Sequence, residues 1–153
     1  MVQNIKIQEF EPRFGTEAVE LICAWLVKLG LAPESVRPSA DSDLSNINDV
    51  YSGRSRFWVA LDNSGKVVGT AAIREMDTDS AELKRMYVEE AWHSKGVAQQ
   101  LLLESLVFAK RQSYKKIILE TNKVMTRAHR FYEKHGFVRT SENEQCYFYE
   151  RLI

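Results

Sequence analysis

The stretch from Val88 to Ala98 combines residue types that bind anions. A short polar run, His93-Ser94-Lys95, leads to Gly96, and apolar residues at helical spacing follow at once. Glycine adopts backbone angles that other residues avoid and lets a ligand approach closely. The first N–H groups of a helix lack partners within the helix and carry partial positive charge. A pyrophosphate would satisfy several of these groups together, and the alternative is a plain turn between a strand and a helix.

The common sequence signatures of phosphate binding are absent. Neither G-x-x-x-x-G-K-S/T nor G-x-G-x-x-G occurs in the chain, so the usual P-loop and dinucleotide-binding motifs do not explain this loop. The 21 Lys and Arg residues are balanced by 21 Asp and Glu residues, so no overall basic field attracts a phosphate backbone. The loop therefore requires another phosphate-bearing ligand, and nucleic acid is not expected as a partner.

The first part of the chain is predicted to form the elements that lead into this loop. Alternating apolar residues indicate strands, apolar residues three and four apart indicate a helix, and clusters of Asp, Asn, Ser and Gly indicate turns. The order is a strand, a helix, a polar loop with at most one short helix, and three strands that form an antiparallel meander. Their ranges are Ile5–Ile7, Phe14–Lys28, Pro33–Gly53, Phe57–Leu61, Val67–Ile73 and Glu82–Val88.

The second part of the chain continues from the loop with an amphipathic helix. Its apolar and small residues recur at i, i+3, i+4, i+7, i+8 and i+11, which is one helix face. A strand with a continuous apolar core, a second helix ending at Gly136 and two closing strands complete the order. Their ranges are Ala98–Gln112, Lys116–Thr121, Thr126–His135, Phe137–Val138 and Cys146–Leu152.

Length and composition predict one folded domain over residues 1–153. A chain of 153 residues buries about two-thirds of its unfolded surface, which suits a single core. Hydrophobic residues make up 44% and charged residues 27%, as in ordinary globular proteins. The longest apolar run, Leu21 to Val27, is far shorter than the roughly 20 residues of a membrane span. With no signal-peptide pattern at the start, we expect a cytoplasmic protein with no membrane partner.

The cysteine and histidine residues do not indicate a metal site. Cys23 and Cys146 do not form a C-x-x-C pair, so we read both as reduced, buried thiols. His129 and His135 are six residues apart on a predicted helix and do not share a face. No metal is expected.

Four segments, taken together, resemble a known family in order and spacing. They are Glu82-Leu83-Lys84-Arg85-Met86-Tyr87-Val88, His93-x-x-Gly96-x-Ala98, Asn122, and Phe131-Tyr132-x-x-x-Gly136-Phe137. This pattern resembles the GNAT superfamily of acyl-CoA-dependent N-acyltransferases. The resemblance covers a little over a third of the chain, and His93 departs from the Gln or Arg that the family usually has there. It implies an α/β (α+β) fold: a mixed, mostly antiparallel central sheet of six to seven strands, flanked by about four helices and splayed in the middle to hold the cofactor.

The resemblance implies that acetyl-CoA is the co-substrate. The loop and the first helical turn would hold its pyrophosphate, and the pantetheine arm would pair with the strand backbone at Tyr87 and Val88. Asn122 would bond the pantetheine amides, although a turn-forming asparagine is the alternative. His93 and Lys95 are alternatively a solvated loop pair. The cofactor residues implied are Tyr87, Val88, His93, Ser94, Lys95, Gly96, Val97, Ala98, Gln99, Asn122, Phe131 and Tyr132.

The resemblance also implies catalytic roles for Glu82 and Tyr132. An alkyl ammonium of pKa about 10.4 must lose a proton before it attacks a thioester, at a cost of roughly 4 kcal/mol at neutral pH. Glu82 would remove this proton directly or through water, the backbone N–H of Val88 would stabilise the oxyanion, and Tyr132 would donate a hydrogen bond to the departing thiolate. An exposed strand glutamate and a core tyrosine are the alternative interpretations.

The sequence predicts an acetyl-CoA-dependent N-acetyltransferase that works through a ternary complex. A non-catalytic acyl-CoA-binding sensor is the main alternative, and a nucleotide-binding protein unrelated to coenzyme A is another. Acceptor identity is assigned mainly to the segment from Pro33 to Arg56, whose mixed charges select no particular amine. The oligomeric state also stays open, with a homodimer among the alternatives.

Overall fold

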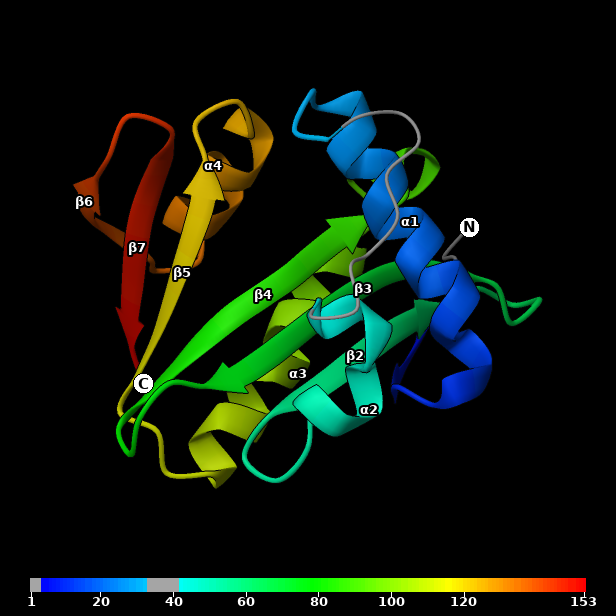
Figure 1. Cartoon of the computed structure of the whole chain (residues 1–153), viewed down its shortest axis with the longest axis horizontal. Coiled ribbons are helices and arrows are strands. Elements are labelled where there is room, and N and C mark those ends of the chain that lie inside the picture. Colours follow the sequence, from blue (N-terminus) through cyan, green and yellow to red (C-terminus); the bar gives the residue numbers. More distant parts are fainter. Residues whose placement is uncertain (1–3, 33–41) are drawn as a thin grey trace.

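The computed structural model describes residues 4–32 and 42–153, which form a seven-stranded mixed sheet (Figure 1). The strand order is β1-β2-β3-β4-β5-β7-β6. All neighbouring strands are antiparallel except β4 and β5, which are parallel. The strands are β1 (Lys6–Glu9), β2 (Arg56–Leu61), β3 (Val67–Glu75), β4 (Ser80–Val88), β5 (Lys116–Asn122), β6 (Val138–Glu142) and β7 (Cys146–Leu152).

Helices cover both faces of this sheet and create two apolar cores. One face carries α1 and α2, whose residues Ala18, Ile22 and Ile47 are buried against β2 and β3. The other face carries α3 and α4, which bury Leu101, Tyr132 and neighbouring residues. The helices are α1 (Gly15–Lys28), α2 (Ile47–Val50), α3 (Val97–Arg111) and α4 (Thr126–Lys134), with short 3-10 turns η1 (Pro12–Phe14), η2 (Asp43–Ser45) and η3 (Glu90–Trp92).

The predicted order of elements and the predicted fold class are confirmed. The meander β2-β3-β4, the helices α1, α3 and α4 and the closing strands lie within a few residues of their predicted ends. The predicted loop at 33–53 holds η2 and α2 in its described part, and residues 33–41 lie outside the described residues. Cys23 and Cys146 are unpaired as expected, but both are half-buried rather than buried. No helix in residues 4–32 or 42–153 is long and apolar enough to cross a bilayer.

A gap opens in the middle of the sheet because β4 and β5 pair over only one end. Their register covers three pairs, from Ser80↔Lys116 to Glu82↔Ile118. Beyond Glu82 the two strands diverge, as Figure 1 shows for the green and yellow arrows. The backbone of β4 from Leu83 to Val88 therefore has no neighbouring strand on its β5 side, as the predicted splay requires.

A β-bulge shapes the unpaired half of β4. Thr70 pairs with Tyr87 and Ala72 with Lys84, so Arg85 and Met86 together lie opposite one residue of β3. Arg85 has a φ of 56°, which is uncommon for a residue with a side chain. The Thr70 hydroxyl donates a hydrogen bond of 2.7 Å to the Arg85 carbonyl and secures the bulge to β3.

A glycine lets α3 approach this part of the sheet. A Cβ atom on Gly69 of β3 would lie 3.0 Å from Leu101 and 3.2 Å from Val97, closer than side-chain contacts normally allow. Close packing of α3 on β3 fixes the start of α3 beside the end of β4. The loop between them is thereby held at the mouth of the gap.

Candidate active site

Most of the predicted cofactor residues line one cavity of about 360 Å³ beside the gap. The end of β4, the loop 89–96, the first turn of α3 and one face of α4 contribute its walls. The predicted residues that line it are Tyr87, Val88, His93, Ser94, Gly96, Val97, Ala98, Gln99, Phe131 and Tyr132. The fold thus brings the loop and α4 together, although they are more than 30 residues apart in the sequence.

The loop between β4 and α3 contains two residues with positive φ. Ser94 and Gly96 have φ values of 63° and 84°, and alternation of this kind turns successive amides toward one side and makes an anion-binding concavity. Gly96 is also the N-cap of α3, where no side chain caps the helix and the first turn has no acidic residue. The Arg127 guanidinium of α4 donates a 2.9 Å hydrogen bond to the Ser94 hydroxyl, so a cation lies beside this concavity.

The His93 side chain contacts the end of β4. Its Nε2 atom lies 3.0 Å from the Val88 carbonyl oxygen, and since a carbonyl only accepts, Nε2 is the donor. The indole of Trp25 donates to the same oxygen at 2.9 Å and stacks on the His93 ring. We call Trp25 and His93 the Val88 clamp. It ties α1 to the end of β4 and directs the His93 side chain toward that strand.

Two predicted cofactor residues lie outside this cavity. Lys95 places its ammonium 5.5 Å from the centroid of the Trp92 ring, a cation–π arrangement at the surface. The side chain of Asn122 accepts a hydrogen bond from the Val124 N–H, and its carbonyl accepts one from His129. Asn122 lines a second cavity instead, so the turn-forming interpretation describes its side chain.

That second cavity, of about 320 Å³, lies next to the first and contains Glu82. Four residues, Met86, Tyr87, Met125 and Tyr132, line both cavities. The two predicted catalytic residues therefore share a cavity, although they come from β4 and α4. Tyr132 lines both the cavity beside the loop 89–96 and the cavity that contains Glu82.

The phenol of Tyr132 is suited to donating a proton in a hydrogen bond. The residue is 7% exposed, and this burial raises the pKa of Tyr132 well above its ordinary value. The hydroxyl is therefore uncharged at every physiological pH. A raised pKa also makes complete proton transfer to a thiolate more unfavourable, which favours hydrogen bonding over protonation.

The amide of Met86 points into the gap, and sequence reasoning missed it. The Arg85 carbonyl accepts from Thr70 on β3, and in a trans peptide the following N–H points the opposite way. Met86 N–H therefore faces away from β3. A strand rises about 3.3 Å per residue, so Glu82 is separated by roughly 13 Å of strand from Met86 and by roughly 20 Å from Val88. Residues two apart in a strand point the same way, so Met86, two residues before Val88, could have been identified from the Val88 prediction.

A buried ion pair holds the bulge from the α1 and α2 side. Arg85 donates to Asp43 through Nε at 3.0 Å and through Nη2 at 2.5 Å, and the Tyr51 hydroxyl donates to the same carboxylate at 2.5 Å. Burial alone would raise the pKa of Asp43, but the hydrogen bonds from Arg85 and Tyr51 and the Arg85 charge lower it to about 2. Asp43 is therefore an anion at physiological pH and keeps Arg85 in place.

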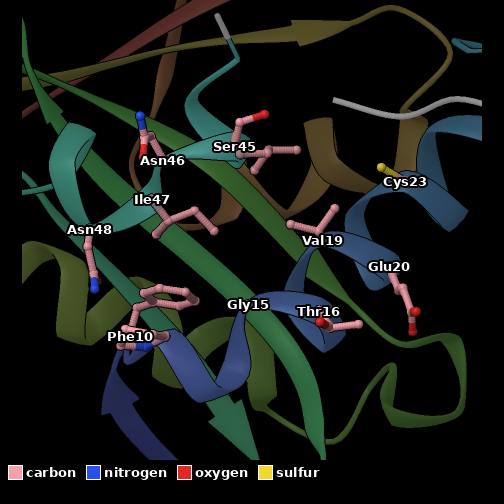
Figure 2. A pocket seen from close by; sticks show the side chains of 12 residues that line it. Phe10, Gly15, Thr16, Val19, Glu20, Cys23, Ser45, Asn46, Ile47 and Asn48 are labelled. Carbon is pink, nitrogen blue, oxygen red and sulfur yellow. The ribbon is translucent and has the colours of Figure 1, made fainter. Parts of the chain in front are cut away.

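A hollow of about 630 Å³ lies between α1 and the η2–α2 segment (Figure 2). Thr16, Val19 and Cys23 of α1 stand on one side, and Ser45 to Asn48 stand on the other. It is larger than the two cavities at the gap, but none of the predicted site residues lines it. Volume alone therefore does not identify the site.

The residues that the sequence did not identify come from elements distant in the chain. Trp25, Met86 and Arg127 each line the first cavity. From the sequence alone, Arg127 is what a solvent-facing helix would carry. Among the described residues 4–32 and 42–153, no group of three or more His, Cys, Asp or Glu side chains is placed to hold a metal ion.

A family model for the acetyltransferase (GNAT) domain matches residues 53–139. This span contains the bulged strand, the loop 89–96 and Tyr132, and it covers more than half of the chain. The chain therefore belongs to the GNAT acetyltransferase family, and the predicted resemblance is confirmed.

Relatives and solved structures agree with this assignment. N-acetylaspartate synthetase of Xenopus tropicalis is 40% identical over 99 residues, which are 63% of this chain and 36% of that protein. The chain spans about a third of the length of the N-acetylaspartate synthetases that it matches. A GNAT-family acetyltransferase of Staphylococcus aureus Mu50 superposes with a TM-score of 0.88 at 24% identity, covering 97% and 99% of the two chains. PaiA N-acetyltransferase of Thermoplasma acidophilum, solved in complex with coenzyme A, superposes with a TM-score of 0.77 at 18% identity, covering 98% and 99%.

Proposed function

We propose that this protein is an N-acetyltransferase that moves an acetyl group from acetyl-CoA to a primary amine by direct attack in a ternary complex. The observation that carries the proposal is the junction of the two cavities at Met86, Tyr87, Met125 and Tyr132. One cavity begins at the anion-binding loop, and the other contains Glu82. A thioester carrier gripped by its diphosphate would reach the junction from one side, and an amine would reach it from the other.

The unpaired edge of β4 supplies the binding surface for the carrier's arm. Beyond Glu82 no strand pairs with β4 on its β5 side, so its N–H and C=O groups there are open to a ligand with amides of its own. The Val88 clamp occupies the Val88 carbonyl. The arm would therefore use the Val88 N–H and the groups next to it on β4.

Glu82 acts as the general base in this proposal. An amine with a pKa near 10.4 arrives mostly as the ammonium ion, and the carboxylate of Glu82 accepts its proton. Roughly 13 Å of strand lies between Glu82 and Met86, and a glutamate side chain covers only part of that length. The proton therefore passes through bridging water, one of the two routes that the sequence left open.

The oxyanion and the thiolate each receive a hydrogen bond. The Val88 N–H is the donor predicted from the sequence, and the Met86 N–H is the donor nearer to Glu82 on the same edge. Either amide stabilises the charge that develops on the thioester oxygen. Tyr132, kept as a neutral phenol by burial, donates to coenzyme A sulfur as the C–S bond breaks. No covalent enzyme intermediate is required.

We also propose that the protein works in the cytoplasm and that the acceptor is a small molecule. The unpaired Cys23 and Cys146 support a reducing compartment. The volume of the Glu82 cavity, about 320 Å³, suits a small acceptor.

A thiol-release assay with acetyl-CoA and a panel of primary amines tests the proposal, run beside calorimetry with coenzyme A and ATP. We expect amine-dependent thiol release and binding of coenzyme A in preference to ATP. Glu82→Gln should lower kcat at least tenfold, with coenzyme A affinity nearly unchanged. Coenzyme A binding without release on any amine would support a sensor, and tighter binding of ATP would support a nucleotide-binding protein.

A further inference from the structure

Within the part of the chain that the structure describes, hydrogen bonds engage only one edge of the Arg85 guanidinium. Asp43 engages Nε and Nη2, and this edge-on pairing uses two of the five N–H donors of the group. Arg85 also lines the cavity that contains Glu82. Its side chain is 21% exposed, against 7% for Asp43, so the ion pair is buried on the Asp43 side and open on the cavity side.

The surroundings hold this guanidinium in one orientation. Tyr51 donates to Asp43, Thr70 secures the Arg85 carbonyl, and Arg85 has a φ of 56°. Backbone strain of this kind persists where the surrounding structure fixes it, and it gathers at functional sites. A pre-oriented arginine loses little side-chain entropy on binding, and its planar fork matches a carboxylate.

The charges around the cavity complement a molecule that carries both signs. Among the described residues, its acidic side chains are Glu82 and Glu120 and its basic ones are Lys84 and Arg85. The Arg85 charge is balanced by Asp43, so the remaining charges favour an ammonium ion near Glu82 and Glu120. A diamine would bring a second cation toward Lys84, where like charges repel.

We propose that Arg85 binds a carboxylate on the acceptor, so that the acceptor class is amines with a carboxylate close to the amino group, such as α-amino acids. This inference rests on the proposed function. Arg85 directly precedes Met86, whose N–H is one of the two amides proposed to stabilise the oxyanion and the one nearer to Glu82. A carboxylate held by Arg85 would therefore lie a short distance from an amine that attacks at Met86, as it does in an α-amino acid.

Matched pairs of amino acids and their decarboxylated amines test the proposal on the full chain. The pairs are L-alanine with ethylamine, L-leucine with isoamylamine, and L-phenylalanine with phenethylamine, each assayed for acetyl transfer. We expect higher kcat/KM for at least one amino acid than for its amine. Arg85→Gln should lower this ratio roughly 10- to 100-fold, which is the range of a charge-assisted hydrogen-bonded pair. Arg85→Lys keeps the positive charge but loses the planar guanidinium, so its ratio should lie between those of the wild type and Arg85→Gln.

The controls separate recognition from support of the bulge. Arg111→Gln removes an equal charge from an exposed site at the end of α3 and should leave every ratio unchanged. If Arg85→Gln lowers kcat/KM for both members of a pair equally, Arg85 only supports the bulge and the inference is wrong. Should Arg85→Gln not fold, a wild-type preference for the decarboxylated amines throughout would still overturn it. Acetyl transfer to no amine at all would overturn the proposed function itself.

Discussion

Tyr132 is the residue at which the cofactor side and the Glu82 side of the site meet. Because burial raises its pKa, the phenol stays protonated well into the alkaline range. We expect Tyr132→Phe to lower kcat roughly 10- to 100-fold, the effect of removing one hydrogen bond to a developing charge. KM for acetyl-CoA should change little. Ionisation of Tyr132 should not lower the wild-type rate up to pH 10, so the wild type and the variant should have pH–rate profiles of the same shape on the alkaline side. Steady-state kinetics from pH 6 to 10 measure kcat, KM and this shape.

His93 is the residue at which this chain departs from its family, and the structure supplies a reason. Its Nε2 donates to the Val88 carbonyl, a task that any neutral donor of similar reach can perform. We expect His93→Ala to raise KM for acetyl-CoA several-fold and His93→Gln to restore most of the loss. A glutamine variant as impaired as the alanine variant would contradict the clamp.

Some site residues followed from local sequence, and others depend on tertiary contacts. The positive φ of Gly96 and the free N–H groups after it are local properties, so the loop could be predicted. Trp25 lies 63 residues from Val88, to which it donates, and no periodicity in α1 indicates that contact. Asn122 was assigned by family resemblance, but its side chain serves its own turn.

At the scale of elements, the ion pair between Asp43 of η2 and Arg85 of β4 should make stability depend on pH. The carboxyl pKa of Asp43 is about 2 when folded against an ordinary value near 3.9. A lowered folded pKa contributes stability above the unfolded value and loses it as the pH falls through the folded one. Asp43 therefore contributes on the order of 2 kcal/mol above about pH 4, which disappears between about pH 4 and 2.

The Asp43→Asn variant makes this contribution measurable. The difference in unfolding free energy between the wild type and the variant should increase from pH 2 to pH 4 and then stay constant. Urea denaturation at several pH values measures it. Asp79→Asn, which removes a carboxylate from an exposed turn, is the control and should show little pH-dependent difference. If the difference in unfolding free energy between the wild type and Asp43→Asn did not change with pH, the charged form of Asp43 would add no net stability.

The helices and strands were predictable because the apolar residues of each recur at the spacing typical of its structure. Alternation predicted the meander and helical spacing predicted α1, α3 and α4, within a few residues of their observed ends. The bulge in β4 was not predicted, because nothing in Lys84-Arg85-Met86 signals it. It depends on Asp43 and Thr70, which come from a segment predicted as loop and from the neighbouring strand.

At the scale of the molecule, the sheet consists of two parts joined at one end. β1 to β4 form one part and β5 to β7 the other, with three residue pairs between them. Each part has its own helices, and the predicted cofactor residues come from both. Family resemblance predicted this arrangement from four short segments, while the acceptor class emerged only when the structure placed Arg85 and Glu82 around one cavity.

The short seam between β4 and β5 has a consequence for handling the protein. Where β4 and β5 diverge, two strand edges lie without a strand partner inside the sheet, whereas most proteins keep such edges covered. A strand from a neighbouring molecule can satisfy the same backbone groups. The proposed binding mode places coenzyme A over these edges. In solutions depleted of coenzyme A, the protein should therefore self-associate more readily as its concentration rises, and bound coenzyme A should protect it from self-association.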